Sequence, residues 1–210
     1  MYLPQHFAES RVEVMHAFMR KHPLGVLVAN TPAGLDANHV PFVTDSEPAP
    51  WGRLRCHVAR ANPIWSAVEQ ANDVLVIFQG PEAYVSPSVY EAKRRDGKVV
   101  PTWNYVTVHA YGKARVVHEH EWLLAQLHAL TATQESGRPE PWHVDDAPAD
   151  FTSKLIRAIV GIEITIEKLI GKWKVSQNRS RIDRANIAAD LRSQSAARHG
   201  EMIQLLEDGG

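Results

Sequence analysis

The 210-residue sequence has a single cysteine, and this scarcity excludes several classes of protein. With Cys56 alone, an intramolecular disulfide, a zinc site built on thiolates and a Cys-x-x-Cys redox pair are all impossible. Chains without disulfides are typical of reducing compartments, so we expect a cytoplasmic protein. The N-terminal segment also lacks an unbroken apolar run, and we therefore expect neither a signal peptide nor a membrane span.

Familiar catalytic signatures are missing as well. The sequence contains no Gly-x-Gly-x-x-Gly, Walker loop, Gly-x-Ser-x-Gly or His-Glu-x-x-His motif. Its net charge of −1 gives no domain-wide basic surface of the kind that nucleic-acid binders carry. Cations instead gather between Gly171 and Arg184, where five Lys and Arg residues face one acidic residue, Asp183. Such clustering favours a local anion site over a surface that coats DNA.

Two residue pairs invite other kinds of chemistry. Cys56 and His57 are adjacent on a predicted strand, so their side chains point to opposite faces and cannot form a nucleophile–base pair with each other. We interpret Cys56 as a buried small residue. His118 and His120 share a face and could ligate a metal, but no third ligand stands nearby in the sequence. We interpret them as a solvated strand end and predict no metal site.

The order of apolar patterns predicts an α+β protein. Strands are expected at 24–29, 39–44, 54–59, 73–79, 102–117 and 161–170, with a short extended piece at 83–86. The segment 102–117 is either one long strand or two strands joined at Gly112. Helices are expected at 9–21, 63–70, 121–134, 150–159, 181–194 and 201–207. We interpret Gly80-Pro81 as the end of a strand. We interpret the charged segment EAKRRDGK as an exposed loop. About six strands arrive in hairpin order with the helices inserted late, which is typical of an antiparallel barrel or sheet with peripheral helices.

The strand that opens at Gly161 changes character along its length. Ile162, Ile164 and Ile166 alternate with polar residues, which predicts one buried face and one face toward water. From Lys172 onward the sequence places cations and amides around an aromatic ring. Such residues at a strand end suit a planar, anionic, hydrogen-bonding ligand.

Two further segments have related chemistry. In LRCHVARANP a strand runs into a predicted helix start, where Arg60, Asn62 and free backbone N–H groups favour an anion. In PTWNY, Trp103 stands beside Asn104, a pair that could flank a flat ring. Together with GKWKVSQNR, these segments predict a ligand that has both a phosphate and an aromatic ring.

The same segments carry a family resemblance. The opening MYLPQHF, the HVARANP turn, PEAYVSPSVY, PTWNYVTVHAYG and GKWKVSQNR together resemble the PaiB-type "FMN-binding negative transcriptional regulator" family, in order and over most of the chain. The resemblance implies an antiparallel split β-barrel related to the pyridoxamine-phosphate oxidases. It also implies a homodimer with FMN at the subunit interface.

Carried over by position, the resemblance assigns residues to the cofactor. The phosphate is expected near the turn His57, Val58, Ala59, Arg60 and Asn62, and the ring near Trp103 and Asn104. Lys174, Gln177 and Asn178 are expected to close the site from the same or the other subunit.

Three functions stay open at this point. The protein could be a flavoprotein with redox or flavin-carrying activity, in which FMN supplies the electron chemistry and no protein nucleophile is needed. It could be a regulator that binds DNA or a partner and senses FMN, although DNA rests on family analogy alone. It could also be a barrel that has lost its cofactor. We expect a split-barrel domain over residues 1–180 and a helical extension over residues 181–210 packed on the barrel.

Overall fold

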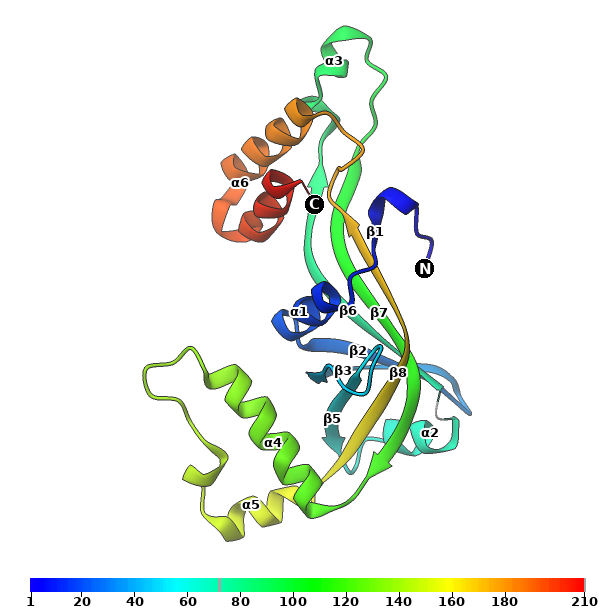
Figure 1. Cartoon of the computed structure of the whole chain (residues 1–210), viewed down its shortest axis with the longest axis vertical. Helices are drawn as coiled ribbons and strands as arrows, with labels where there is room; N and C mark the ends of the chain where they lie inside the picture. The colour runs from blue at the N-terminus through cyan, green and yellow to red at the C-terminus, as the bar shows by residue number, and fades with distance from the viewer. Residues whose placement is uncertain (72, 210) are drawn as a thin grey trace. The chain divides into compact units, whose positions relative to one another are not determined.

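A computed structural model describes residues 1–71 and 73–209 of the chain (Figure 1). Its strands are β1 (Ala8–Glu9), β2 (Leu24–Thr31), β3 (Gly34–Pro41), β4 (Val43–Asp45), β5 (Arg53–Ala59), β6 (Asp73–Val85), β7 (Thr102–Val117) and β8 (Ile159–Lys174). Its α-helices are α1 (Val12–Lys21), α2 (Ile64–Ala71), α3 (Glu91–Arg95), α4 (His120–Glu135), α5 (Ala149–Ile156) and α6 (Arg181–Asp208). Short 3-10 turns occur at Gln5–Phe7, Pro87–Val89 and Val144–Asp146.

The strands form one sheet whose order closes it into a barrel. The order is β3-β2-β6-β7-β8-β5-β4, with β1 paired to β8. The two end strands, β3 and β4, are consecutive in the chain and separated only by Phe42. The sheet must therefore curl until its ends meet, and β3 does contact β5. The predicted α+β fold with an antiparallel split barrel and a helical C-terminus is confirmed.

The chain divides into two compact units. Unit 1 comprises residues 1–11, 79–108 and 170–210, and unit 2 comprises residues 12–78 and 109–169. Strands β6, β7 and β8 contribute residues to both. The expected division into a domain of residues 1–180 and an extension of residues 181–210 stays a prediction.

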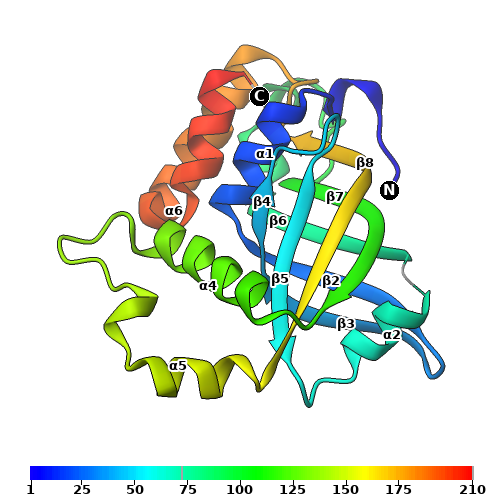
Figure 2. The same cartoon turned by 60° about the horizontal axis from the view of Figure 1, so that its bottom comes forward.

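Unit 2 contains core residues of the barrel and helix α4, which packs against the outside of the sheet. Leu54, Ile162 and Ile164 are fully buried at the paired strands β5 and β8. Helix α4 contacts β4 and β5 (Figure 2). A side chain at Gly161 would run into the ring of Trp122 on α4, so this glycine allows the helix to approach the sheet closely.

In unit 1, α6 is anchored to the segment that follows β6. Ser180 caps the helix by accepting a hydrogen bond from the Asp183 N–H at 3.0 Å. The Asp183 carboxylate accepts in turn from the Glu91 N–H at 3.1 Å, where α3 begins. The helix breaks at Ser195, whose backbone angles are not helical, which agrees with the two helices predicted over this segment.

Four local expectations were wrong. The segment EAKRRDGK contains the short helix α3 and is not only a loop. Gly80-Pro81 does not end a strand, since β6 continues through it to Val85. Strand β2 pairs with β6 only over Val74–Ile77, so Pro81 lies beyond this pairing and removes no hydrogen bond to β2. The first helix starts at Val12, not near Glu9, because Ala8 and Glu9 pair with β8.

Glu163 is the fourth difference. The alternation in β8 predicts that it faces water, yet it is only 8% exposed. Arg115 donates to its Oε1 at 2.9 Å and the Trp122 indole N–H to its Oε2 at 3.4 Å. Helix α4 therefore covers a face that the strand pattern alone assigns to solvent, and the buried carboxylate is paired as its charge requires.

Candidate functional site

The ten residues predicted from the sequence fall into two groups, one in each unit. Those of the turn after β5 lie in unit 2, and those of β7, β8 and the loop after β8 lie in unit 1.

In unit 2, the side chains predicted to hold phosphate already have structural partners. Arg60 donates from Nε to the carbonyl of Arg157 and from Nη2 to that of Ile159, both at 2.9 Å. Asn62 accepts from the Ile64 N–H at 3.0 Å, as an N-cap does, and donates to Asn38 Oδ1 at 2.7 Å. The turn is thus held together by these donors, and part of the Arg60 guanidinium remains for a ligand.

The other predicted residues of this group have mixed exposure. His57 donates from Nδ1 to Gln126 Oε1 at 2.8 Å, and Gln126 is fully buried on α4. Val58 belongs to the barrel core, whereas Ala59 is exposed. The neighbouring Cys56 is completely buried, and burial raises the pKa of its thiol far above the ordinary value. The interpretation of Cys56 as a buried small residue is confirmed, because a thiol in that state is not a nucleophile.

In unit 1, three predicted residues line one cavity of about 180 Å³. They are Asn104, Lys174 and Asn178. The full lining is Phe7, Val100, Pro101, Thr102, Asn104, Lys174, Ser176, Asn178 and Arg179. The strand ends of β7 and β8 meet here, which brings together side chains more than 70 positions apart in the sequence.

Asn104 and Ser176 form the buried polar wall of this cavity. Ser176 Oγ donates to Asn104 Oδ1 at 3.0 Å, and Asn104 is 1% exposed. Ser176 has a left-handed backbone conformation, with φ of 63°, in the loop after β8. Within the described part of the chain, the Asn104 Nδ2 group has no hydrogen-bond partner.

Lys174 supplies a partly buried charge. Its Nζ donates to Thr102 Oγ1 and to the carbonyl of Trp103. Burial, and then the positive charges of Lys172 and Arg179, lower the pKa of the Lys174 ammonium below its ordinary value. Three cations therefore share this end of the strands without a lining carboxylate in the described cavity.

Two predicted residues of this group do not line the cavity. Trp103 is 53% exposed and packs edge-on against Tyr84, with ring centroids 5.8 Å apart. Gln177 folds back on its own loop, where it accepts from the Val175 N–H at 3.0 Å and donates to the Trp173 carbonyl.

Six lining residues were not among the ten predicted from the sequence. Five of them stand inside the motifs that carry the family resemblance, namely Phe7, Pro101, Thr102, Ser176 and Arg179. Their positions in MYLPQHF, PTWNY and GKWKVSQNR were a signal that could have placed them at the site.

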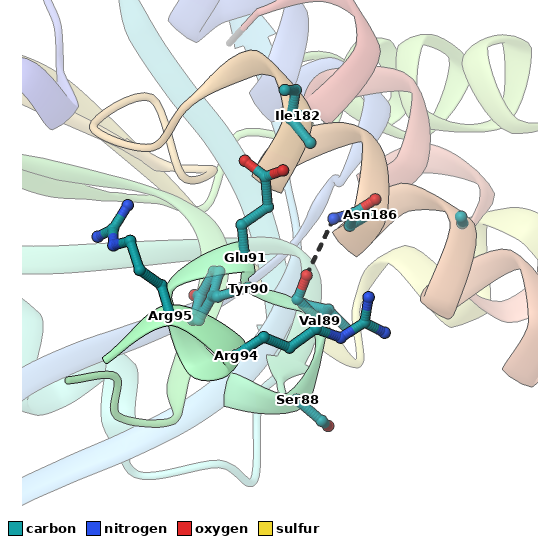
Figure 3. A pocket seen from close by; sticks show the side chains of 9 residues that line it. Ser88, Val89, Tyr90, Glu91, Arg94, Arg95, Ile182 and Asn186 are labelled. Carbon is teal, nitrogen blue, oxygen red and sulfur yellow. Dashed lines mark hydrogen bonds between the residues drawn. The ribbon is translucent and has the colours of Figure 1, made fainter. Parts of the chain in front are cut away.

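A larger pocket of about 810 Å³ lies between α3 and the start of α6 (Figure 3). Asn186 donates to the Val89 carbonyl at 3.0 Å across one of its walls, and Arg94, Arg95 and Glu91 project around it. None of the residues predicted for the cofactor lines this pocket within the described chain.

Among the described residues, no helix is long and apolar enough to cross a membrane.

Comparisons with known proteins agree with these features. An uncharacterized protein of Emericella nidulans is 36% identical over 222 residues, covering 89% of this chain and 88% of that protein. The protease synthase and sporulation protein PAI 2 of Bacillus subtilis is 32% identical over 208 residues, covering 99% of this chain and 97% of that protein. The structure of the flavocytochrome Anf3 of Azotobacter vinelandii matches with a TM-score of 0.60 at 15% identity, over 82% of this chain and 72% of that chain, which shows a shared fold.

The match to a family model covers most of the sequence. The model "Putative FMN-binding domain" matches residues 1–168. Together with the full-length similarity to PAI 2, this match confirms the PaiB-type resemblance and the prediction of FMN as the cofactor. The chain therefore belongs to the FMN-binding domain family.

Proposed function

We propose that this protein is an FMN-dependent flavoprotein in which the chain binds and orients the cofactor and FMN supplies the electron chemistry. The family match over residues 1–168 is the observation that carries the proposal. The cavity of unit 1 supports it, because Asn104 offers a buried unpaired donor and Lys174 a partly buried charge to an anionic, hydrogen-bonding ligand.

The cavity is too small for the whole cofactor. Sites that hold a complete ligand of this size have volumes of roughly 300–1,000 Å³, whereas this one measures about 180 Å³. We therefore assign to it one part of FMN. His57, Val58, Ala59, Arg60 and Asn62 in unit 2 and Trp103 and Gln177 in unit 1 remain candidates for the rest of the contacts.

We propose that the active form is a homodimer with FMN at the subunit interface. Exposed aromatic rings support this proposal, since Trp103 and Tyr84 form a half-exposed pair on β6 and β7. Light scattering at micromolar concentration should give twice the chain mass. A monomer at that concentration would contradict the dimer.

The absorption spectrum of the purified protein tests the flavoprotein directly. We expect the two visible flavin bands, and quenching of free FMN fluorescence to saturate at one FMN per chain. Absence of both, with a folded protein by circular dichroism, would overturn the proposal and favour a barrel that has lost its cofactor.

A regulator that binds DNA is the second candidate, favoured by the family resemblance. Two arginines of α6 argue against it, because Arg192 pairs with Glu207 at 2.6 Å and Arg184 donates to the Gly209 carbonyl at 3.3 Å. Duplex binding that survives about 150 mM salt and depends on Arg181, Arg184 or Arg192 would support the regulator instead.

We also propose a cytoplasmic location, because the lone thiol of Cys56 is buried and forms no disulfide. Fractionation of cells that express the tagged chain tests this.

A further inference from the structure

The cavity of unit 1 has an excess of positive charge, and no carboxylate is among its described lining residues. Lys174 and Arg179 line it, and Lys172 lies close enough to lower the pKa of Lys174. The guanidinium of Arg179 lies over the ring of Tyr90, 4.5 Å from the ring centroid. None of the described ion pairs gives Arg179 a carboxylate partner. Such a concentration of cations is unfavourable unless an anion joins it.

Some hydrogen-bond donors at this cavity have no acceptor in the described chain. Lys174 has three N–H donors, and the described structure uses two of them, toward Thr102 and Trp103. Asn104 uses its carbonyl with Ser176 and leaves its buried Nδ2 group unpaired. Buried polar groups in folded proteins are almost always hydrogen-bonded, so an unpaired buried donor beside a cation indicates an acceptor that comes from outside the chain.

The turn after β5 offers a much poorer anion site. Both side-chain ends of Asn62 are engaged, and two N–H groups of Arg60 donate to backbone carbonyls. The first N–H of α2 is already capped by Asn62. Most of the donors that the sequence assigned to a phosphate therefore hold the turn together, whereas the buried Nδ2 group of Asn104 in unit 1 still lacks an acceptor in the described chain.

We propose that the unit 1 cavity is an oxyanion subsite that holds a phosphate group through Asn104, Lys174 and Arg179. A phosphate matches the site because its several oxygens can accept from a lysine, a guanidinium and an amide at once. It also fits within about 180 Å³, which a flavin ring with its ribityl chain would not. The subsite itself does not depend on flavin binding; only the identification of the phosphate as that of FMN rests on the proposed function.

Titration with inorganic phosphate in the absence of flavin tests the subsite. Calorimetry gives the affinity, and the side-chain NH₂ signal of Asn104 in a ¹H–¹⁵N spectrum, assigned by its loss in Asn104→Asp, reports the location. In the wild type we expect saturable binding and a shift of that signal at constant ionic strength.

Three variants and a control decide the assignment. Lys174→Met and Arg179→Gln should each weaken phosphate binding by about ten- to a hundredfold, the effect of losing one charged hydrogen bond. Asn104→Asp should abolish it by repulsion. Arg181→Gln, an exposed arginine two positions from Arg179 that does not line the cavity, should bind as the wild type does. If Asn104→Asp fails to fold, the more exposed Arg179→Gln still decides.

Unsaturable binding to the wild type, or equal binding to the wild type, Lys174→Met and Arg179→Gln, would overturn the subsite. FMN and riboflavin titrations then identify the source of the phosphate. If phosphate weakens FMN binding but not riboflavin binding, the subsite holds the cofactor's own phosphate. If FMN-loaded protein binds inorganic phosphate with the same affinity as flavin-free protein, the subsite takes a separate phosphate-bearing ligand. If no flavin binds while phosphate does, the proposed function fails and the subsite stands.

Discussion

Single residues in this structure show how a polar group's partner decides its role. Asn62 and Asn104 have the same side chain and were both predicted to touch the cofactor. Both the oxygen and the nitrogen of the Asn62 amide form hydrogen bonds within the chain, to Ile64 and Asn38. In Asn104 only the amide oxygen does so, by accepting from Ser176. The unpaired end of a buried amide is therefore a better indicator of a ligand than its position in a motif.

Arg60 should contribute more to stability than to FMN affinity. Arg60→Ala removes hydrogen bonds to the carbonyls of Arg157 and Ile159, which we expect to lower the free energy of unfolding by about 1–2 kcal/mol. Urea denaturation without flavin measures this change, and Arg60→Lys, which can restore one of the two bonds, should show a smaller loss. Unchanged stability with a tenfold or greater loss of FMN affinity would return the phosphate to this turn.

His109 on β7 should make the protein sensitive to acid. Burial lowers the pKa of His109 below its ordinary value of 6.5, and its Nδ1 is buried without a partner in the described structure. Because the unfolded chain binds a proton more readily, the free energy of unfolding should fall as the pH drops below about 6.5 toward the folded-state pKa.

Denaturation of the wild type and His109→Gln at pH 7.5 and 5.5 measures this effect. We expect the loss of stability between the two pH values to be smaller in His109→Gln. His120→Gln, at an exposed histidine, is the control and should keep the loss seen in the wild type. An equal loss in all three proteins would assign the acid sensitivity to other groups.

At the scale of elements, the packing of α4 on the sheet depends on one missing side chain. Gly161→Ala places a Cβ against the ring of Trp122 and within 3.2 Å of Leu123, so we expect it to cost about 1–3 kcal/mol of stability. Gly137→Ala is the matched control, because a Cβ there meets nothing within 4 Å. Thermal unfolding compares the two. Equal midpoints would mean that α4 shifts away from the sheet without cost.

Sequence periodicity predicted the ends of a strand well where the alternation of side chains along that strand alone determines which of them are buried. The long strand β7 has the predicted ends, Thr102 and Val117, because a period-2 pattern continues along it, with aromatic rings as far as Tyr111 and with Lys113 and Arg115 beyond. Periodicity failed where a distant element changes the surroundings, as at Glu163, which α4 buries, and at Pro81, which lies beyond the range where β2 pairs with β6.

At the candidate site, too, local patterns were predictive and contacts from distant segments were not. The strand-end motifs placed Asn104, Lys174 and Asn178 at one cavity, because the ends of paired strands coincide whatever their distance in the sequence. The partners of Arg60 and Asn62 could not be predicted, since Arg157 and Asn38 come from segments that no local pattern connects to the turn.

At the scale of the whole molecule, exposure of large apolar rings bears on assembly. Trp103 is on β7, which lies between β6 and β8 in the sheet, a position where an aromatic ring is usually part of the core. The structure leaves it 53% exposed, so its packing against Tyr84 accounts for only part of its surface. A ring of this size that remains half exposed is better explained by a partner surface or a flavin than by stability of the chain alone.

Trp103→Ala should therefore weaken assembly and FMN binding more than folding. We expect a lower dimer fraction at micromolar concentration and a loss of FMN affinity of about tenfold or more, with a small change in the unfolding midpoint measured at low protein concentration without flavin. Trp142→Ala is the matched control, because this tryptophan of unit 2 is 49% exposed and lies outside the predicted site. Sedimentation velocity and flavin fluorescence measure the two effects. If Trp103→Ala lowers the midpoint strongly while mass and affinity stay those of the wild type, the ring belongs to the fold of the single chain, and the dimer must be sought on another face.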